Sequence, residues 1–398
     1  MKILVVSSYL PYPLHNGGHI RLYNLLKEIS KNHEITLVCE KRDYQTEKDV
    51  QEMEKICKKV ITVRRRKQWA VGNILKTGFS LNPFLIVGHT NKDMKDAILE
   101  LLSKEKFDLI HVETFYVMQN LPKTQIPIVL AEHNIEHMVY KKFADRKFLL
   151  RFPFYLDVLK MKRIEKSFWK KAAKLIAVSE EEKKLMNRED AAIVPNGVDT
   201  TKFQPKADCP LDDKVKNERK ILFIGDFKWM QNKDTIEWIL KEIWPSFIKI
   251  SEGKPEAKLW IVGKNIPSSI KKLSDGDGSV IFDEDNKQET SEIFKKADLL
   301  LAPIRVGGGT SYKILEAMAS GVPVITTQLG AEGINAKKNE DILVSDNAEE
   351  IAKMVNDILD DEKFYSKISQ NARKIVEDKY DWKIIVKKLE GVYQSAIR

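Results

Sequence analysis

The chain has 398 residues, of which 43 % are hydrophobic and 31 % are charged, and this composition excludes an intrinsically disordered protein. Its 67 Lys and Arg residues exceed its 58 Asp and Glu residues by nine, and the excess lies in residues 1–200, which carry 35 bases and 25 acids. No apolar run reaches the roughly 20 residues that cross a bilayer, and the three cysteines lack the spacing of a disulfide framework or a zinc site, so we expect a cytoplasmic protein.

Apolar runs of strand length alternate with helical patterns along the first half of the chain. The helical stretches are His19–Lys31, Lys92–Lys104 and Val158–Ala172. The predicted strands are Ile3–Val6, Ile35–Val38, Val60–Val63, Leu109–Val112, Ile126–Leu130 and Leu175–Val178. These strands are apolar throughout, as expected when helices cover both faces of a parallel sheet.

The second half repeats this alternation. Its predicted helices are Thr235–Trp244, Glu289–Lys296 and Thr310–Ala319. Its predicted strands are Ile221–Ile224, Lys258–Val262, Val280–Phe282, Leu299–Ala302 and Val322–Thr326. The sequence therefore predicts two doubly wound α/β domains in series, at residues 1–199 and 200–380, followed by a C-terminal helix within residues 381–398.

Two glycine-rich turns are candidate anion sites. Gly17–Gly18 follows the first predicted strand and opens a helix, so free N–H groups there would stabilise negative charge, although a tight turn explains the pair equally well. The second turn, Gly307–Gly309, lies between a strand and a helix. Its bare backbone, flanked by Arg305 and Lys313, forms a candidate cradle for a diphosphate.

A carboxylate lies on the helix that follows this second turn. Lys313 and Glu316 are three residues apart and share one helix face. Glu316 could accept hydrogen bonds from two vicinal hydroxyls, as a ribose presents them. The alternative is that Lys313 and Glu316 form a solvated ion pair and that the glycines form a hinge.

With these segments in view, the chain resembles the retaining glycosyltransferases of family 4, which have the GT-B fold. The resemblance is carried by Gly307–Thr327, Val178–Glu180, Val194–Asp199 and Phe223–Asp234, together with the Gly17–Gly18 turn. It implies two Rossmann-like parallel-sheet domains that face an interdomain cleft, with the acceptor bound by the first domain and the nucleotide diphosphate-sugar held mostly by the second. It also implies that the C-terminal helix crosses back onto the first domain.

The resemblance assigns roles to individual residues. Glu316 would bind the ribose, and the backbone of Gly308–Thr310 would hold phosphate and sugar hydroxyls. His133 would contact the donor sugar near the reacting carbon, with Asn134 and Glu136 as neighbours on the acceptor side.

Two positions depart from the family pattern. Glu316 lacks the usual glutamate partner eight residues earlier, where this chain has Gly308, and Asp226 stands where the family often has an arginine. We therefore expect Arg305 and Lys313, with Lys228 as a further candidate and Lys233 as its alternative, to neutralise the phosphate charge.

Metal sites are the competing interpretation of two segments. His133–His137 matches H-x-x-E-H, an inverted zinc-protease motif, but the preceding β-rich run places His133 at a strand end. Asp283–Asp285 has the letters of the metal motif of the other glycosyltransferase fold, but its position between a strand and a helix predicts a polar loop. We expect neither a metal nor a cofactor, the nucleotide diphosphate-sugar being a substrate.

Two basic stretches explain the charge of the first half. Arg64–Lys76 has five cations and no acid, and Lys141–Lys174 has twelve cations against three acids. The second stretch also contains Phe148, Phe152, Phe154, Tyr155, Phe168 and Trp169. Cations mixed with aromatic residues suit an anionic membrane surface. Nucleic acid would use similar groups, though no recognised binding module accompanies them, and solvated helix faces with packed aromatics are the structural alternative.

We therefore expect a metal-independent, retaining glycosyltransferase that takes part in cell-envelope polysaccharide assembly. Its acceptor is expected to be a glycan or a lipid-linked molecule, and its first domain to dock on the cytoplasmic face of the membrane, with no nucleic-acid partner. A nucleotide-sugar epimerase on the same architecture and an inactive nucleotide-binding scaffold at a membrane surface are the alternatives.

Overall fold

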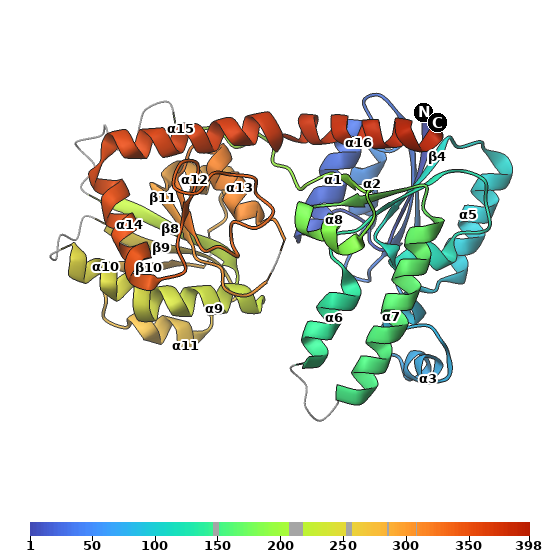
Figure 1. The fold of residues 1–398 in the computed structure, drawn as a ribbon, viewed down its shortest axis with the longest axis horizontal. Coiled ribbons are helices and arrows are strands. Elements are labelled where there is room, and N and C mark those ends of the chain that lie inside the picture. Colours follow the sequence, from blue (N-terminus) through green and yellow to red (C-terminus); the bar gives the residue numbers. More distant parts are fainter. Residues whose placement is uncertain (146–150, 207–217, 252–256, 285, 308) are drawn as a thin grey trace. The chain divides into compact units, whose positions relative to one another are not determined.

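The computed structural model describes residues 1–145, 151–206, 218–251, 257–284, 286–307 and 309–398. Contacts divide the chain into two compact units (Figure 1). Unit 1 consists of Met1–Pro195 together with Ile385–Arg398, and unit 2 consists of Asn196–Ile384. Each unit is a parallel sheet with helices packed on it, which confirms the α/β class predicted from the sequence.

Unit 1 contains a seven-stranded sheet in the order β3-β2-β1-β4-β5-β6-β7, in which every pair of neighbouring strands is parallel. The strands are β1 (Lys2–Ser7), β2 (Glu34–Lys41), β3 (Lys59–Arg64), β4 (Leu109–Glu113), β5 (Ile128–Ala131), β6 (Lys174–Ala177) and β7 (Ala192–Ile193). A parallel strand needs a crossover connection, and most of the crossovers here are helical. The helices are α1 (Gly17–Ile29), α2 (Glu47–Glu54), α3 (Val71–Phe79), α4 (Phe84–His89), α5 (Lys92–Lys104), η1 (Phe115–Asn120), α6 (Glu136–Asp145), α7 (Arg151–Lys171) and α8 (Glu180–Met186).

Both faces of the unit 1 sheet are buried, which explains why most residues of its central strands are apolar. Leu4 of β1 belongs to one hydrophobic cluster with Ile98 of α5 and Phe168 of α7. The next residue, Val5, is buried to the same degree, and it points to the opposite face because successive side chains alternate along a strand. The sheet is therefore covered on both sides.

Unit 2 contains a six-stranded parallel sheet in the order β10-β9-β8-β11-β12-β13. Its strands are β8 (Arg219–Asp226), β9 (Ala257–Lys264), β10 (Val280–Asp283), β11 (Leu299–Ala302), β12 (Val324–Thr326) and β13 (Leu343–Val344). Its helices are α9 (Met230–Trp238), η2 (Ile239–Ile243), α10 (Trp244–Ile250), α11 (Ser268–Lys271), η3 (Lys272–Ser274), α12 (Thr290–Lys296), α13 (Tyr312–Ala319), α14 (Ala348–Asp360) and α15 (Glu362–Lys379). The last helix of the chain, α16 (Trp382–Ile397), begins in unit 2, and its residues from Ile385 onward belong to unit 1.

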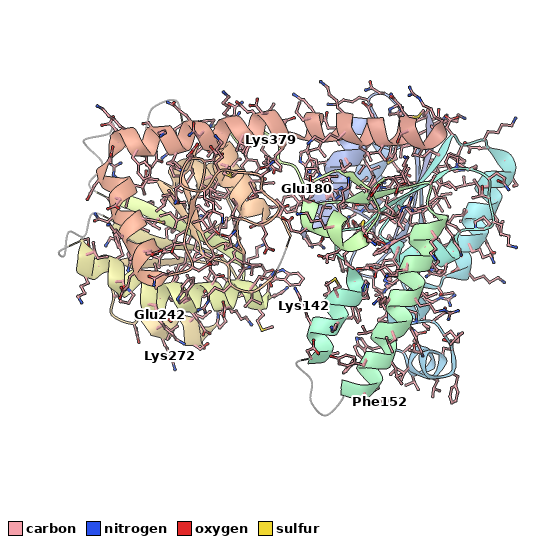
Figure 2. All side chains as sticks on the ribbon, in the orientation of Figure 1. Lys142, Phe152, Glu180, Glu242, Lys272 and Lys379 are labelled. Atoms are coloured by element: carbon pink, nitrogen blue, oxygen red, sulfur yellow. The ribbon has the colours of Figure 1, made fainter. Side chains whose placement is uncertain are left out.

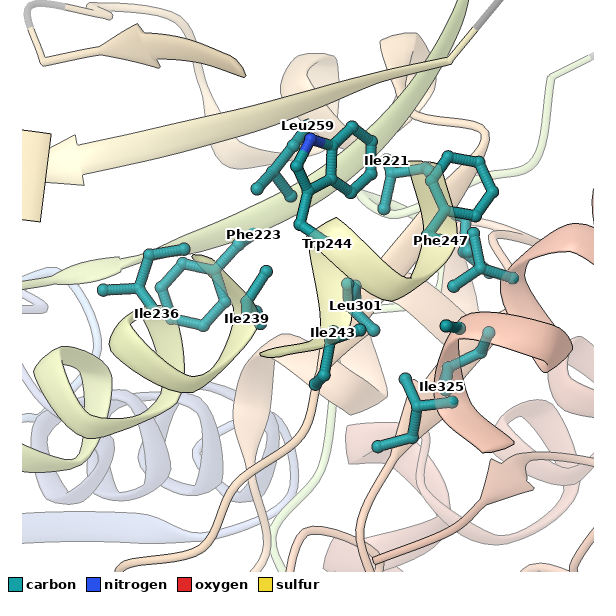
Figure 3. Packing of buried hydrophobic residues seen from close by; sticks show 14 of the residues in the cluster. Ile221, Phe223, Ile236, Ile239, Ile243, Trp244, Phe247, Leu259, Leu301 and Ile325 are labelled. Atoms are coloured by element: carbon teal, nitrogen blue, oxygen red, sulfur yellow. The ribbon is translucent and has the colours of Figure 1, made fainter. Parts of the chain in front are cut away.

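Figure 3 shows the core on one face of the unit 2 sheet. Trp244 and Phe247 of α10 lie with their ring centroids 5.0 Å apart and pack over aliphatic side chains of the strands. The labelled residues of this cluster are Ile221, Phe223, Ile236, Ile239, Ile243, Trp244, Phe247, Leu259, Leu301 and Ile325. Burial of this many large apolar side chains fixes the segment from α9 to α10 on the sheet.

The structure differs from the predicted elements in a few places. Strands β7 and β13 were not predicted, because two residues are too short to give a periodic signal. Helix α13 begins at Tyr312 and not at Thr310, because Thr310 is buried with its hydroxyl donating to the carbonyl of Gly333 at 3.3 Å. Strand β12 begins at Val324, two residues later than predicted.

The longest helix, α7, has 21 residues, seven of which are Lys or Arg. Across the described ranges, no helix combines the length and the apolar composition that a membrane crossing requires.

A close approach of two strands in unit 2 gives a test of this packing. Gly263 of β9 lies beside Gly225 of β8, and a Cβ atom on Gly263 would come within 1.9 Å of the Gly225 carbonyl oxygen. We expect Gly263→Ala to destabilise unit 2 by roughly 1–3 kcal/mol, measured as a lower midpoint of thermal unfolding. Gly278→Ala is the matched control, since a Cβ there meets nothing within 4 Å. An unchanged midpoint for Gly263→Ala would contradict the strand pairing.

Candidate functional site

In both sheets the chain reverses its direction of winding next to the first strand. In unit 1 this reversal lies between β1 and β4, and in unit 2 it lies between β8 and β11. In open parallel sheets, ligands bind outside the carboxyl ends of the strands at this point. The residues that follow these four strands are therefore the first candidates for a site.

The glycine turn after β11 has an open surface. Gly307 and Gly309 have φ angles of +129° and +79°, which side chains other than glycine rarely adopt. A Cβ atom on either residue would meet nothing within 4 Å, so no side chain of the described residues fills the space above them. Gly308, the third residue of the predicted cradle, lies outside the described residues. Thr310, which follows, is buried.

Arg305 is fixed as a cation beside this turn. Its Nε and Nη2 atoms donate to the two carboxylate oxygens of Asp234, each at 3.2 Å. Its guanidinium lies over the ring of Trp238, 4.4 Å from the centroid. Both partners belong to α9, the helix that follows β8. A bidentate pair stacked on an aromatic ring restricts the orientation of the guanidinium, and within the described ranges its Nη1 has no hydrogen-bond acceptor.

Lys313 is fixed in a similar way from the first turn of α13. Its ammonium donates to Oδ1 of Asn232 at 2.9 Å and lies 4.5 Å from the ring centroid of Phe223. Asn232 in turn donates from Nδ2 to the carbonyl of Asp226 at 2.8 Å, which ties Lys313 to the carboxyl end of β8. Burial lowers the pKa of Lys313 to about 8, against the attraction of Glu316.

Glu316 lies three residues further along α13. Burial raises its pKa to about 7, although the charges of Lys202 and Lys313 act in the opposite direction. The Lys313 ammonium donates to Asn232, and the ion pairs found among the described residues do not include one between Lys313 and Glu316. The predicted alternative of a solvated Lys313–Glu316 ion pair is therefore not what the structure contains.

Asp226, which stands in place of the expected arginine, has a local structural role. Its Oδ1 accepts hydrogen bonds from the backbone N–H of Lys228 at 2.9 Å and from Nδ2 of Asn265 at 2.8 Å. These bonds shape the turn between β8 and α9. The side chain of Lys228 is exposed, and the Lys233 side chain is partly exposed in the first turn of α9.

The corresponding edge of unit 1 is built around the buried carboxylate of Glu113, the last residue of β4. Its Oε1 contacts Nε2 of His133 at 2.5 Å, and its Oε2 contacts Nε2 of His111 at 2.7 Å. Nδ1 of His111 lies 2.9 Å from the hydroxyl of Tyr393 in α16. The guanidinium Nε of Arg21 lies 3.6 Å from Oε1 of Glu113. His133 is thus held by a network that begins in the first helix and ends in the last.

These contacts keep Glu113 ionised. Burial alone raises the pKa of this carboxyl, but the charges and hydrogen bonds of His133 and His111 outweigh burial and hold the pKa well below its ordinary value. The next residue, Thr114, has a φ angle of +68°, which is unusual for a β-branched residue. Backbone strain of this kind is found most often where surrounding contacts impose a functional geometry.

The Gly17–Gly18 turn forms the start of α1 at the same edge of the sheet. Neither glycine has a positive φ angle, so the tight-turn explanation does not hold. The side chain of Asn16 caps the helix by accepting from the N–H of His19 at 3.1 Å. The hydroxyl of Tyr9 donates to the carbonyl of Gly18 at 3.2 Å, and a Cβ on Gly18 would lie 3.2 Å from that hydroxyl.

The acceptor-side candidates are placed differently from each other. Asn134 is exposed, whereas Glu136 is buried and accepts a short hydrogen bond from the hydroxyl of Tyr116. Burial raises the pKa of Glu136 to about 7. The carboxylate of Glu165 accepts from the backbone N–H of Glu136 at 2.8 Å and so caps α6 from the neighbouring helix.

The two metal interpretations find no support in the contacts. His133 precedes α6 and contacts Glu113, whereas His137 lies in the first turn of α6 and contacts Glu165. The two histidines therefore do not share a helix face, as the zinc motif requires. In the second segment, Oδ2 of Asp283 accepts from Nε1 of Trp260 at 3.2 Å, and Asp285 is outside the described residues. Over the described part of the chain, no group of three or more His, Cys, Asp or Glu side chains could hold a metal ion.

The sequence pattern did not single out the residues that fix the candidate side chains. Glu113, Asn232, Asp234 and Trp238 hold His133, Lys313 and Arg305 in place. Glu113 could have been found, because it is an acid at the carboxyl end of a buried strand, where the site of a parallel sheet is expected.

Two known families match consecutive parts of the chain. Residues 15–202 match the family described as Glycosyltransferase Family 4, and residues 218–361 match the family described as Glycosyl transferases group 1. Together the matches take in most of both units.

Individual proteins agree with this result. A 44.6 kDa protein in the cps region of Klebsiella pneumoniae is 25 % identical over 395 residues, which cover 96 % of this chain and 97 % of that protein. A phosphatidyl-myo-inositol mannosyltransferase of Mycolicibacterium smegmatis is 28 % identical over 213 residues, which cover 52 % of each chain.

Solved structures support the fold. Sucrose-phosphate synthase from Thermosynechococcus elongatus has a TM-score of 0.70 at 17 % identity and covers 99 % of this chain and 98 % of its own. Anabaena HepE, in complex with UDP and glucose, has a TM-score of 0.67 at 14 % identity and covers 99 % of this chain and 100 % of its own. These neighbours have the GT-B fold, which confirms the fold class expected from the sequence.

The raised pKa of Glu316 gives a pH test of its environment. The unfolded chain ionises this carboxyl near pH 4.5 and the folded chain near pH 7, so the stability associated with its protonated form is lost as pH rises through that range. Glutamine does not ionise, so we expect Glu316→Gln to remove this loss. The thermal midpoint of the variant minus that of wild type should therefore increase between about pH 5 and pH 8, by an amount equivalent to roughly 1–3 kcal/mol.

The control is Glu292→Gln in the exposed Glu292–Lys295 ion pair of α12. A difference between Glu316→Gln and wild type that does not vary with pH would show that Glu316 is solvated.

Proposed function

Because this chain is a GT-B glycosyltransferase that belongs to family 4, we propose that it transfers a sugar from a nucleoside diphosphate-sugar to a glycan or lipid-linked acceptor. The observation that carries the proposal is the open glycine turn at the reversal point of the unit 2 sheet, with Arg305 and Lys313 fixed beside it. Transfer with retention of configuration and without a metal ion is part of the proposal.

The leaving group of such a reaction explains why fixed cations are needed. When the bond between the anomeric carbon and the β-phosphate oxygen breaks, negative charge develops on the diphosphate. Donors that are already oriented stabilise this charge without reorganisation. Asp234 and Asn232 orient Arg305 and Lys313, and Glu316 would accept from the ribose hydroxyls.

The acceptor side of the reaction is assigned to unit 1. The acceptor oxygen forms a bond to the anomeric carbon on the face that the diphosphate leaves, and its proton passes to a phosphate oxygen of the leaving group. His133 would contact the donor sugar, with Gly17 and Gly18 lying at the same edge of the unit 1 sheet. Glu113 would act as a positioning residue, because its carboxylate fixes the imidazole of His133.

The names of the relatives support the finer parts of the proposal. HepE was solved with UDP, so uridine nucleotides are the first donors to test. A relative in a cps region supports polysaccharide assembly, and a relative named for phosphatidyl-myo-inositol supports an acceptor that carries lipid.

Donor binding by unit 2 is tested with nucleotides. We expect one of UDP, GDP and ADP to raise the thermal midpoint of the wild-type protein, because a ligand that binds only the folded state stabilises it. Arg305→Ala and Glu316→Ala should each weaken the binding of that nucleotide by about tenfold or more, since each removes a charge-assisted contact. The same substitutions should lower nucleotide release from the matching sugar donor, and EDTA should leave that release unchanged.

Glu292→Ala on the surface of unit 2 is the control for these variants. Undiminished binding and nucleotide release in both site variants would overturn the assignment of the donor site.

The role of His133 is tested separately. We expect His133→Ala to lower the rate of sugar transfer roughly 10²-fold, as the loss of one oriented polar contact in a transition state does. Glu113→Gln should lower kcat by a smaller factor while leaving the KM for the donor nearly unchanged, because it acts on the orientation of His133. His33→Ala, at another histidine of unit 1 that contacts a glutamate, is the control. Equal activity of His133→Ala and wild type would remove His133 from the reaction.

A further inference from the structure

The two basic stretches of unit 1 separate into core and surface in the structure. Phe168 and Trp169 are buried in the hydrophobic core, so the structural alternative holds for these two aromatic residues. Phe154 and Tyr155 are partly buried, and Phe148 lies outside the described residues. Phe152 remains strongly exposed.

Helix α3 buries none of its residues. Phe79 is 92 % exposed and Val71 is 73 % exposed, and Ile74 and Leu75 are exposed as well. Trp69, just before the helix, is 76 % exposed. A helix that forms without burying its apolar side chains gains little from packing in this chain, so a further surface is needed to cover it.

The start of helix α7 presents a second exposed apolar surface. Phe152, Leu156 and Leu159 are exposed and lie at helical spacing of four and then three residues, so they share one face. Four and seven residues after Leu159 the same face continues with Arg163 and Lys166, both exposed. Figure 2 places Phe152 at the end of α7 that is remote from the unit 1 sheet.

Hydrogen bonds hold these two surfaces together. Nζ of Lys160 in α7 donates to the carbonyl of Thr77 in α3 at 2.6 Å. Asp157 of α7 accepts from the backbone N–H of Phe84, at the start of α4, at 2.8 Å. Figure 1 shows α3 beside the lower half of α7, away from the sheet. We call this region the apolar tip; its exposed residues are Trp69, Val71, Ile74, Leu75, Phe79, Leu81, Phe152, Leu156 and Leu159.

The charges around the apolar tip are mostly positive. An exposed acid also lies beside it, Asp145 of α6, which accepts a hydrogen bond from the hydroxyl of Tyr155. From Arg64 to Lys92 the sequence contains no acid. The two acids of α7 are both engaged, Asp157 with the N–H of Phe84 and Glu165 in the buried cap of α6. The exposed cations on these segments include Arg66, Lys67, Lys76, Lys162, Arg163 and Lys166.

We propose that the apolar tip docks unit 1 on an anionic lipid bilayer, with the apolar side chains in the interfacial region and the cations at the lipid headgroups. This partner fits because an amphipathic surface of aromatic and aliphatic side chains with Lys and Arg at its edge combines apolar burial with attraction to anionic lipids. The inference rests on the proposed function in one respect: docking would present unit 1 to a lipid-linked acceptor.

The test is binding of the full chain to vesicles. We expect the protein to co-sediment with vesicles that contain phosphatidylglycerol, and at least about tenfold less with vesicles of phosphatidylcholine alone, at moderate salt. The double variant Phe79→Ser/Leu159→Ser should lower binding to the anionic vesicles by about tenfold or more, because two large apolar side chains no longer leave water. Lys76→Glu/Arg163→Glu should reduce the preference for anionic lipid.

Leu99→Ser on α5 is the matched control, since it also removes an exposed leucine of unit 1 and should leave vesicle binding unchanged. Equal binding by wild type and Phe79→Ser/Leu159→Ser would overturn the proposal. So would a lipid-free dimer that this double variant dissociates, because a second copy of the chain would then cover the tip.

Nucleotide binding separates this inference from the proposed function. Phe79→Ser/Leu159→Ser should keep the full thermal shift with the nucleotide that stabilises wild type, because its substitutions lie in unit 1. If nucleotide raises the thermal midpoint of the wild-type protein but the protein does not bind anionic vesicles, the docking surface alone is overturned. If the protein binds anionic vesicles through the apolar tip but none of the nucleotides raises its thermal midpoint, the docking surface is supported and the donor site is overturned.

Discussion

The arrangement of both units depends on one constraint, which is that neighbouring strands run parallel and must be joined by crossovers over the faces of the sheet. The carboxyl ends of all strands then lie at one edge, and the reversal of winding leaves room beside β1 and β8. Glu113 lies at this edge in unit 1, at the end of β4. Arg305 and the Gly307–Gly309 turn lie at the corresponding edge in unit 2, after β11. The loops at this edge hold the candidate site residues, while the buried strands form the hydrophobic cores.

Specific partners fix the charged groups at these edges. The charged groups are also partly buried. Lys313 is held by Asn232 and Arg305 by Asp234, so the orientation of both cations is set by contacts within unit 2. The buried carboxylate of Glu113 is compensated by two histidines, and this compensation is strong enough to keep it ionised. Removing one member of such a network leaves a buried charge without its partner, which costs more than the contact itself is worth.

Apolar periodicity predicted the α/β class and most of the strands, since buried strands such as Leu299–Ala302 are continuous apolar runs. The same periodicity missed the two-residue strands β7 and β13 and placed the start of α13 two residues early, because a hydrogen bond from Thr310 to Gly333 decides that boundary. The motif pattern located the Gly307–Gly309 turn and His133. It did not find Asn232, because its partner Lys313 is distant in sequence and only the folded sheet brings the two together. It also passed over Glu113, although an acid at the carboxyl end of a buried strand was a usable signal.

The hydroxyl of Tyr393, which meets His111 in the core of unit 1, has a consequence for synthesis on the ribosome. Unit 1 includes both the first 195 residues and the last 14, so its sheet can form early but its interior cannot close until the chain is almost finished. By then all of unit 2 has been synthesised as well, so the core of unit 1 closes only after the segment that forms unit 2 has been made. The N-terminal unit therefore starts folding early but completes its core only with the last residues of the chain, and a nascent chain released early would carry an unfinished unit 1.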